Sequence, residues 1–512
     1  LHHRTLWSRD SICIDLNILI YKKTMKVSDF IAQFLKEHGM NKVFSVTGGF
    51  AMHLNDSFGN QLDVSYLTNE MNCGYAAVGW REPCTVCVTA GCGATNAITP
   101  CLIAWQDSVP VMFISGAVKT TENTREHHRR SRTYSGSDCD IIQMVKCITK
   151  YAVEVENPDD INCIMQEAYW NLTHGRKGPV WISVPLDVQS MEIKYKIDWI
   201  PPTIKPFDDV PRDIFKNSQK PLVIVGNGFH GCDPSKITIP FVVSFFGSDI
   251  PGYVGKIGVI GDKNGNDAFK ESDLVIALGC RLSKTVTGYN GFGKKRVIQV
   301  DIDENEFHKP DIEYIYCDVK TFIENVEWPV SNWFVPEDQP RPDKEPDNPY
   351  TILDKFFDEK PENTTIVASS GSIFCAMWHT LVHKNGDKLL VSSHGDMGFE
   401  LPAAIGHAMR TGRRTYCIVG DGAFQYSIPE LITLKNLPVT IICFNNGGYG
   451  AIKITQRQYF EGREYGTDFD FPSLKEIASV YGIPYFDEYK EVDNGPCIIE
   501  FSVRVQPRMW RT

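Results

Sequence analysis

The chain has 512 residues, which is too many for one hydrophobic core, so two to four domains are expected. Its 42% apolar and 22% charged content is typical of an ordinary soluble globular protein, and a net charge of −11 argues against general nucleic-acid binding. No apolar run is long enough to span a bilayer, so no membrane-spanning helix is predicted.

The N-terminal region and the cysteines indicate in which cellular compartment the protein is expected. Residues 1–24 are expected to form an extension outside the fold. The apolar run at 12–21 is interrupted by polar residues and lacks a cleavage site, so no signal peptide is predicted. The sixteen cysteines lie mostly in apolar runs, which is typical of reduced thiols in a cytoplasmic protein. Cys84 and Cys87 form a single CxxC, better explained by a core strand than by zinc or redox chemistry.

A first α/β domain is predicted over residues 25–190. A patterned helix over 27–38 is followed by Gly39, a residue that often ends helices. Further elements alternate between strand and helix patterns. The predicted strands are 42–46, 85–89, 111–115 and 180–184, and the predicted helices between them include 70–80 and 95–107.

Two later domains are separated by connectors rich in proline and charge. These connectors lie near residues 200–211 and 328–349. The middle domain is predicted over 215–328, with strands at 222–225, 274–277 and 296–301. The last domain covers 350–512. The chain is therefore predicted to be an α/β protein with three consecutive parallel-sheet, Rossmann-like domains.

The last domain contains the most informative pattern of the chain. Strands predicted at 415–419 and 439–444 are joined by a helix predicted at 427–435, which indicates a parallel βαβ unit. Asp421 and Asn446 follow the two strands, at the sheet edge where ligands bind. Their oxygens, with phosphate oxygens and water, suit a near-octahedral Mg²⁺ site, and an adjacent helix N-terminus suits phosphate.

Several motifs carry a resemblance to a known family. Gly420-Asp421-Gly422 with Asn445-Asn446 resembles the GDG and NN motif that binds thiamine diphosphate. Residues 69–77, 90–96, 107–110 and 398–406 resemble segments of the acetolactate synthase and pyruvate decarboxylase superfamily, the last being similar to GFGLPAAIG. Residues 261–263, 279–283 and 446–458 are similar to its acetolactate-synthase-like branch, found in surface-sugar gene clusters. The resemblance covers most of residues 25–505.

The resemblance implies roles for individual residues. Glu70 becomes the glutamate that hydrogen-bonds N1′ of the aminopyrimidine, the carbonyl of Gly395 accepts from N4′, and Met397 supports the bent cofactor. Asp421, Asn446 and the carbonyl of Gly448 become ligands of Mg²⁺. The implied cofactor-binding residues are Gly49, Ser370, Gly371, Ser372, Gly395, Met397, Gly420, Asp421, Gly422, Ala423, Asn446, Gly448 and Tyr449.

The implied reaction is decarboxylation of a 2-oxo acid such as pyruvate, followed by ligation to a ketone acceptor. A simple 2-oxo acid decarboxylase is the alternative. A homodimer or homotetramer with active sites between subunits is also implied. The pair His127-His128 lies in a basic run at 124–132, which fits a catalytic proton donor, a solvated loop, or a site for a phosphorylated acceptor such as a sugar nucleotide.

A rival motif lies in the middle domain. Residues 226–231 match GxGxxG after a predicted strand, and Asp249 follows, so a nicotinamide-linked dehydrogenase is a competing hypothesis. The lone fingerprint is weak, and Pro234 interrupts the helix it requires. In the resembled family this domain sometimes holds FAD in a structural role, so FAD is a possible further cofactor. A non-catalytic scaffold is the third alternative, and Glu70, Asp421 and Asn446 argue against it.

Overall fold

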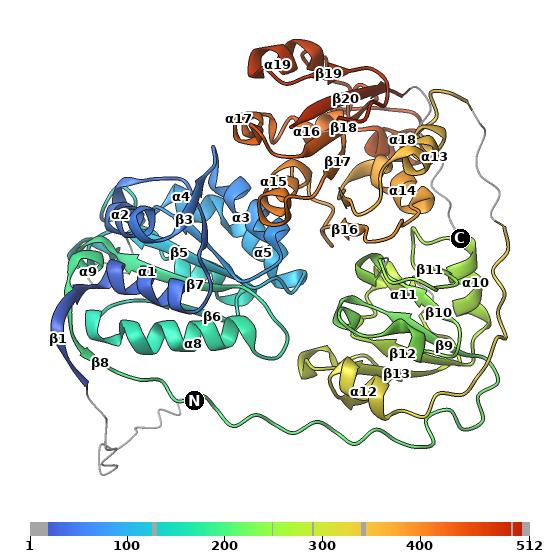
Figure 1. Ribbon diagram of the computed structural model, residues 1–512, viewed down its shortest axis with the longest axis horizontal. Helices are drawn as coiled ribbons and strands as arrows, with labels where there is room; N and C mark the ends of the chain where they lie inside the picture. The colour runs from blue at the N-terminus through green and yellow to red at the C-terminus, as the bar shows by residue number, and fades with distance from the viewer. Residues whose placement is uncertain are drawn as a thin grey trace.

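The computed structural model describes residues 19–124, 131–247, 249–288, 291–338, 345–492 and 495–503. Figure 1 shows three α/β units in chain order, coloured blue to teal, green to yellow, and orange to red. No disulfide joins the cysteines within these ranges. Across the same ranges, no helix is both long and apolar enough to cross a membrane.

The first domain contains a six-stranded parallel sheet in the order β3-β2-β4-β5-β7-β6. Two apolar clusters cover its faces, so its central strands are buried on both sides and read as continuous apolar runs. The strands are β2 (Lys42–Ser45), β3 (Asp63–Tyr66), β4 (Cys84–Val88), β5 (Val111–Ala117), β6 (Tyr151–Glu154) and β7 (Val180–Pro185). The helices are α1 (Val27–Glu37), α2 (Met52–Gln61), α3 (Glu70–Trp80), α4 (Cys92–Asn96), α5 (Ile98–Gln106), α7 (Ile141–Val145), α8 (Ile161–Thr173) and α9 (Leu186–Ser190).

The start of this domain differs from the expected boundary at residue 25. Strand β1 (Leu19–Lys26) pairs antiparallel with β8 (Glu192–Lys196), so residues 19–24 belong to the fold. Strand pairing supplies backbone hydrogen bonds that no local pattern reveals. Residues 1–18 lie outside the described residues, and for them the expectation stays a prediction.

The middle domain contains a second parallel sheet, in the order β11-β10-β9-β12-β13-β14. Its strands are β9 (Pro221–Val225), β10 (Phe241–Val243), β11 (Gly255–Lys256), β12 (Leu274–Leu278), β13 (Arg296–Asp301) and β14 (Glu313–Tyr316). Its α-helices are α10 (Lys263–Glu271), α11 (Lys284–Thr287) and α12 (Val319–Asn325). Extended segments connect this domain to its neighbours, as the proline-rich connectors predicted (Figure 1).

The last domain contains a third parallel sheet, in the order β16-β15-β17-β18-β20-β19. Its strands are β15 (Thr365–Val367), β16 (Lys388–Leu390), β17 (Thr415–Gly420), β18 (Val439–Asn445), β19 (Tyr485–Phe486) and β20 (Cys497–Ser502). Its α-helices are α13 (Pro349–Glu359), α14 (Gly371–Thr380), α15 (Glu400–Thr411), α16 (Asp421–Phe424), α17 (Leu431–Leu434), α18 (Gly450–Tyr459) and α19 (Leu474–Tyr481). The predicted α/β class with three parallel sheets is confirmed.

Short 3₁₀ helices occupy many of the loops. They are η1 (Gly49–Ala51), η2 (Thr120–Glu122), η3 (Lys146–Ile148), η4 (Pro158–Asp160), η5 (Asn227–Phe229), η6 (Pro234–Lys236), η7 (Phe245–Gly247), η8 (Glu304–Glu306) and η9 (Ile428–Glu430). The helix expected over 427–435 is divided into η9 and α17. The helix expected over 95–107 is divided into α4 and α5 at Ala97.

Helices α3 and α15 join the first and last domains (Figure 1). Two glycines allow their backbones to touch. A Cβ atom on Gly79 would lie 2.1 Å from the carbonyl oxygen of Ala403, and one on Gly406 would lie 1.9 Å from that of Ala76. One apolar cluster therefore continues from the first domain into the last.

Candidate active site

The carboxyl end of β17 places Asp421 in a buried position. Asp421 begins α16, directly after Gly420, and is 2% exposed. Its Oδ2 accepts a hydrogen bond from the Gly448 amide at 2.9 Å. Burial raises the pKa of the Asp421 carboxyl, while the amides of Gly448 and Gly422 oppose this rise. The parallel pairing of β17 with β18 brings this group beside the turn that carries Asn446, as predicted.

Two side-chain oxygens at this sheet edge are buried and accept no hydrogen bond from the described residues. They are Asp421 Oδ1 and Asn446 Oδ1. Buried polar atoms are normally paired, so such oxygens indicate a missing ligand. Carboxylate and amide oxygens are the ligands that Mg²⁺ prefers, and it usually retains water and phosphate oxygens as well. The residues present therefore fit the predicted cation.

The turn after Asn446 requires glycine. Gly448 has φ +135°, and a Cβ atom there would lie 2.0 Å from the carbonyl oxygen of Thr467. The Tyr449 amide donates to the same oxygen at 2.9 Å, which holds the turn in place. A Cβ atom on Gly422 would lie 2.5 Å from the Tyr449 ring. The backbone of Gly448 is thus held next to Asp421, in keeping with its predicted role. Ala423, also predicted to bind cofactor, is buried within α16.

No cluster of three or more His, Cys, Asp or Glu side chains within the described ranges is arranged to hold a metal ion. The predicted Mg²⁺ site has one carboxylate, one amide and one backbone carbonyl. Such a site is incomplete without oxygens from a second ligand. A metal held here would therefore bind together with an anion such as a diphosphate.

The turn before α14 is the predicted diphosphate contact. Ser370 precedes the helix, Gly371 begins it with φ +77°, and Ser372 is buried. The N-terminus of a helix offers free amide groups and a favourable dipole for anions. The Ser370 amide and hydroxyl, however, donate to Glu400 Oε1 at 3.0 and 2.9 Å. Sequence reasoning did not identify Glu400, which occupies the place of a glycine in the resembled motif.

Gly395 and Met397 lie on the loop that joins β16 to α15 in the last domain and that contacts the first domain. Gly395 is exposed with φ +71°, and Met397 is half-buried against the apolar cluster shared by the two domains. The side chain of Asp107 holds this loop, accepting from the Ser393 amide at 3.2 Å. Burial raises the pKa of Asp107, and Arg81 and Arg281 oppose that rise. The sequence places Asp107 in a segment that resembles the family, 107–110, but it does not predict the hydrogen bond from Ser393 to Asp107.

Glu70 begins helix α3 and faces an open hollow of about 430 Å³. Asn96 donates to Glu70 Oε2 at 2.9 Å and to Asn69 Oδ1 at 3.1 Å, which orients both residues. Gly93 leaves room beside the carboxyl, because a Cβ atom there would lie 3.2 Å from Glu70 Oε1. The residues that line the hollow are Glu70, Cys92, Gly93, Thr95 and Asn96, all from the first domain.

Gly49 is the remaining predicted cofactor residue. It is exposed at the start of η1, directly after Gly48, whose missing Cβ would collide with Thr89. The turn is also held by the Phe50 amide, which donates to Thr89 Oγ1 at 3.2 Å. The structure thus places Gly49 at the carboxyl side of β2. Its cofactor role stays a prediction.

Glu430 joins the first and last domains of the chain. It is fully buried, and its Oε1 accepts from the Thr68 amide at 2.9 Å, the Thr68 hydroxyl at 2.6 Å and Asn72 Nδ2 at 3.0 Å. Thr68 lies just before Glu70, and Glu430 lies in the helical segment after Asp421. Contacts between residues so distant in sequence leave no local pattern, and sequence reasoning missed this role.

The glycine-rich loop of the middle domain does not form a phosphate site. It continues into the 3₁₀ helix η5 instead of an α-helix. The amides of Gly226 and Gly228 donate to Leu278 and Gly279 carbonyls at 3.0 and 3.1 Å. A Cβ atom on Gly226 would lie 2.4 Å from the Gly279 carbonyl oxygen, so these glycines serve close loop packing. The geometry does not fit a dinucleotide fingerprint.

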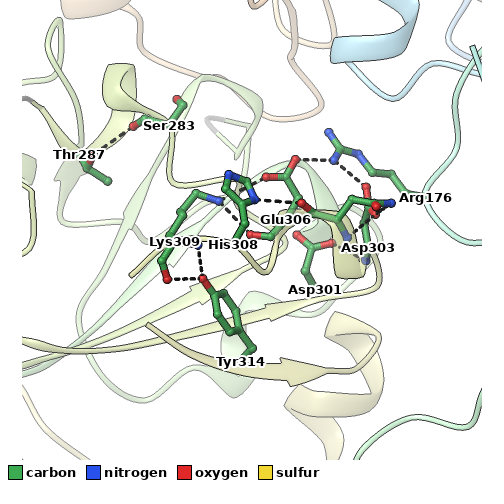
Figure 2. A network of polar contacts seen from close by, with 10 residues as sticks. Arg176, Ser283, Thr287, Asp301, Asp303, Glu306, His308, Lys309 and Tyr314 are labelled. Atoms are coloured by element: carbon green, nitrogen blue, oxygen red, sulfur yellow. Dashed lines mark hydrogen bonds and ion pairs between the residues drawn. The ribbon is translucent and has the colours of Figure 1, made fainter. Parts of the chain in front are cut away.

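A polar network lies beyond the carboxyl end of β13. Arg176 from the first domain pairs with Asp303 at 3.0 Å and with Glu306 at 2.6 Å (Figure 2). Asp301 accepts from the Asp303 amide at 3.1 Å, and Lys309 pairs with Glu306 at 3.3 Å. These contacts attach the middle domain to the first. The basic pair His127-His128, by contrast, lies outside the described residues.

Comparisons with known proteins agree with this geometry. The chain matches three family descriptions in order: "Thiamine pyrophosphate enzyme, N-terminal TPP binding domain" over residues 25–140, "central domain" over 212–326, and "C-terminal TPP binding domain" over 370–495. It is similar to the "Acetolactate synthase isozyme 2 large subunit" of Escherichia coli (strain K12), with 28% identity over 507 residues and 90% of each chain covered.

Two further similarities span nearly the whole chain. The "Acetolactate synthase large subunit" of Lactococcus lactis is 27% identical over 520 residues, covering 91% of this chain and 88% of that protein. Among solved structures, benzoylformate decarboxylase from Polynucleobacter necessarius gives a TM-score of 0.79 at 20% identity, covering 94% of this chain and 99% of the other. The latter likeness concerns the fold. With three matches in order and a site that fits the cofactor, the chain belongs to the thiamine pyrophosphate enzyme family and is a thiamine pyrophosphate-dependent enzyme.

Proposed function

We propose that this enzyme decarboxylates a 2-oxo acid, pyruvate in particular, and ligates the two-carbon unit to a ketone acceptor with thiamine diphosphate and Mg²⁺. The observation that carries the proposal is the pair of buried, unused oxygens on Asp421 and Asn446. Similarity to acetolactate synthases over about 90% of the chain supports ligation rather than simple decarboxylation. The proposed acceptor is a ketone, and a keto-sugar is one candidate.

Thiamine diphosphate, when bound, supplies the nucleophilic carbon and the electron sink that decarboxylation needs. The residues of this chain would bind and orient it. Asp421, Asn446 and the Gly448 carbonyl would hold Mg²⁺, and the turn Ser370–Ser372 would hold the diphosphate. Glu70, oriented by Asn96 at 2.9 Å, would hold a proton at the aminopyrimidine ring. Gly395 and Met397 would position the ring from the opposite domain.

A second copy of the chain is proposed to complete each active site. Among the described residues, those that line the hollow beside Glu70 all belong to the first domain, so the diphosphate side would come from another subunit. Exposed apolar side chains on the last domain, including Tyr426 at 51% and Tyr465 at 73%, support contact with another subunit. A homodimer is the smallest assembly with this geometry. An active monomer, measured by light scattering at assay concentration, would contradict it.

The test combines cofactor binding with product analysis. The apo-enzyme is titrated with thiamine diphosphate at fixed Mg²⁺, and products from pyruvate with and without ketone acceptors are identified by mass spectrometry. We expect a hydroxyketone product, and Asp421→Asn to weaken Mg²⁺-dependent binding by at least ~10-fold. Asp470→Asn, at an exposed position of the same domain, is the matched control. Free acetaldehyde as the sole product would establish a simple decarboxylase instead.

Flavin is not part of the proposed reaction. The glycine-rich loop is closed by Gly279, so this loop does not support a bound dinucleotide. A stoichiometric flavin spectrum in the purified enzyme would contradict this. The suggested phosphate-binding and proton-donor roles of the run at 124–132 stay predictions, since residues 125–130 lie outside the described residues.

A further inference from the structure

The buried carboxyl group of Glu400 lies between the N-termini of two helices. Glu400 is the first residue of α15, and its Oε1 accepts both the amide and the hydroxyl of Ser370, which precedes α14. The residue is 1% exposed. The Glu400 carboxyl therefore already accepts hydrogen bonds from the Ser370 amide and hydroxyl, which belong to the turn where the diphosphate is proposed to bind.

The other carboxyl oxygen of Glu400, Oε2, is buried and takes part in no hydrogen bond among the described residues. A buried carboxyl oxygen without a partner is unfavourable, and each such case in a native protein calls for an explanation. A proton on Oε2 would make it a donor, and a bound anion would supply the acceptor.

The surroundings of Glu400 favour its neutral form. Burial raises its pKa to about 7, while the hydrogen bonds from Ser370 oppose the rise and the nearby Asp396 adds to it. Tyr75 on α3 and Cys417 on β17 also face Glu400, and its negative charge contributes to raising the pKa of each. Protonated and ionised forms of Glu400 are therefore both accessible near neutral pH.

We infer that Glu400 takes up a proton from solvent when the diphosphate reaches the Ser370 turn, and that the protonated carboxyl then donates a hydrogen bond to this anion. The inference rests on the proposed function, because it takes Ser370–Ser372 as the diphosphate contact. In the cofactor-free chain the carboxylate accepts the Ser370 donors. On binding, loss of its charge removes repulsion between two anions in a buried site.

Proton uptake makes cofactor affinity depend on pH. If only the protonated form binds, affinity is nearly constant below about pH 7 and falls tenfold per pH unit above it. The dissociation constant for thiamine diphosphate should then rise about 50-fold between pH 7 and 9. Uptake should approach one proton per site at pH 8 and be small at pH 6. Glu400→Gln carries a permanent N–H donor and should show neither effect.

The experiment is calorimetric titration of the full-length apo-enzyme with thiamine diphosphate at saturating Mg²⁺, from pH 6 to 9. Each titration is run in two buffers of different ionisation enthalpy, which counts the protons taken up. The comparison variant is Asp396→Asn: because Asp396 adds to the raised pKa of Glu400, this change should move the fall in affinity to lower pH without abolishing it. A flat pH profile in Asp396→Asn with an unchanged profile in Glu400→Gln would assign the proton to Asp396 and overturn the inference.

A second variant guards against a folding defect in Glu400→Gln. Ser370→Ala removes the hydroxyl that donates to Glu400 Oε1, which should raise the Glu400 pKa and move the fall in affinity to higher pH. An unmoved profile would overturn the inference. If the wild-type enzyme binds no thiamine diphosphate at any pH, the proposed function itself fails. If wild type and Glu400→Gln bind with the same pH dependence, only the Glu400 inference fails.

Discussion

Glu430 gives a prediction about how the first and last domains are joined. It belongs to the last domain, yet its Oε1 accepts three hydrogen bonds from Thr68 and Asn72 of the first domain. Its Oε2 accepts from the Thr433 hydroxyl at 2.8 Å. The side chain is 0% exposed, so water cannot replace these bonds. Removing the acceptor would leave buried donors unpaired in both domains.

The expected cost follows from these four bonds. Hydrogen bonds to a charged group contribute about 1.5–3 kcal/mol each, but such contributions do not add fully, so Glu430→Ala should lower the free energy of unfolding by roughly 3–5 kcal/mol. Glu430→Gln keeps one oxygen toward Thr68 and Asn72, and its amide can donate to the Thr433 hydroxyl. We therefore expect it to cost only about 1–2 kcal/mol.

Urea unfolding followed by circular dichroism measures these differences. The matched control is Glu461→Ala, whose side chain is 83% exposed and which should change stability by less than about 0.5 kcal/mol. Glu430→Ala should also lower turnover more than Glu430→Gln, because Thr68 lies just before Glu70. A loss of stability in Glu430→Ala no larger than in Glu461→Ala would refute this account of the contact between the domains.

Four further predictions concern other parts of the molecule. Glu70→Gln should lower kcat by about 10²–10⁴-fold with an unchanged urea midpoint, and near-normal turnover would remove Glu70 from the mechanism. Gly406→Ala should cost about 1–3 kcal/mol in thermal unfolding, because its Cβ would lie 1.9 Å from the Ala76 carbonyl oxygen; an unchanged Tm would contradict the close helix contact. Asp107→Asn should weaken thiamine diphosphate binding and cost about 1–3 kcal/mol, because Arg81 and Arg281 lose a buried counter-charge; unchanged affinity and stability would count against it. The raised pKa of Glu400, about 7 against 4.5, means that folding favours its protonated form. The free energy of unfolding therefore includes the full contribution of Glu400 below about pH 4.5 and falls by roughly 3 kcal/mol as the pH rises through about 7. Urea unfolding at pH 5 and pH 8 should show this fall in the wild type but not in Glu400→Gln.

Elements with strong local signals were predicted with accurate bounds. The helix predicted over 70–80 is α3, and the strand predicted over 296–301 is β13. Strands of two or three residues, such as β11 and β19, were not predicted because so short a segment carries no periodicity. Helix 427–435 was predicted as one element, but its first turn, around Pro429, is 3₁₀. Local patterns thus predicted the long elements but not the short ones.

Asp421 and Asn446 were predictable from sequence because each follows a buried parallel strand, and parallel strands end at one edge of a sheet. The fold class followed from the same alternation of strands and helices. Only the tertiary structure decided four side-chain contacts, which are Asn96–Glu70, Asp107–Ser393, Glu430–Thr68 and Glu400–Ser370. Each contact joins residues far apart in the chain. The hydrogen-bond partner of a polar side chain is determined only when packing has excluded water from both groups.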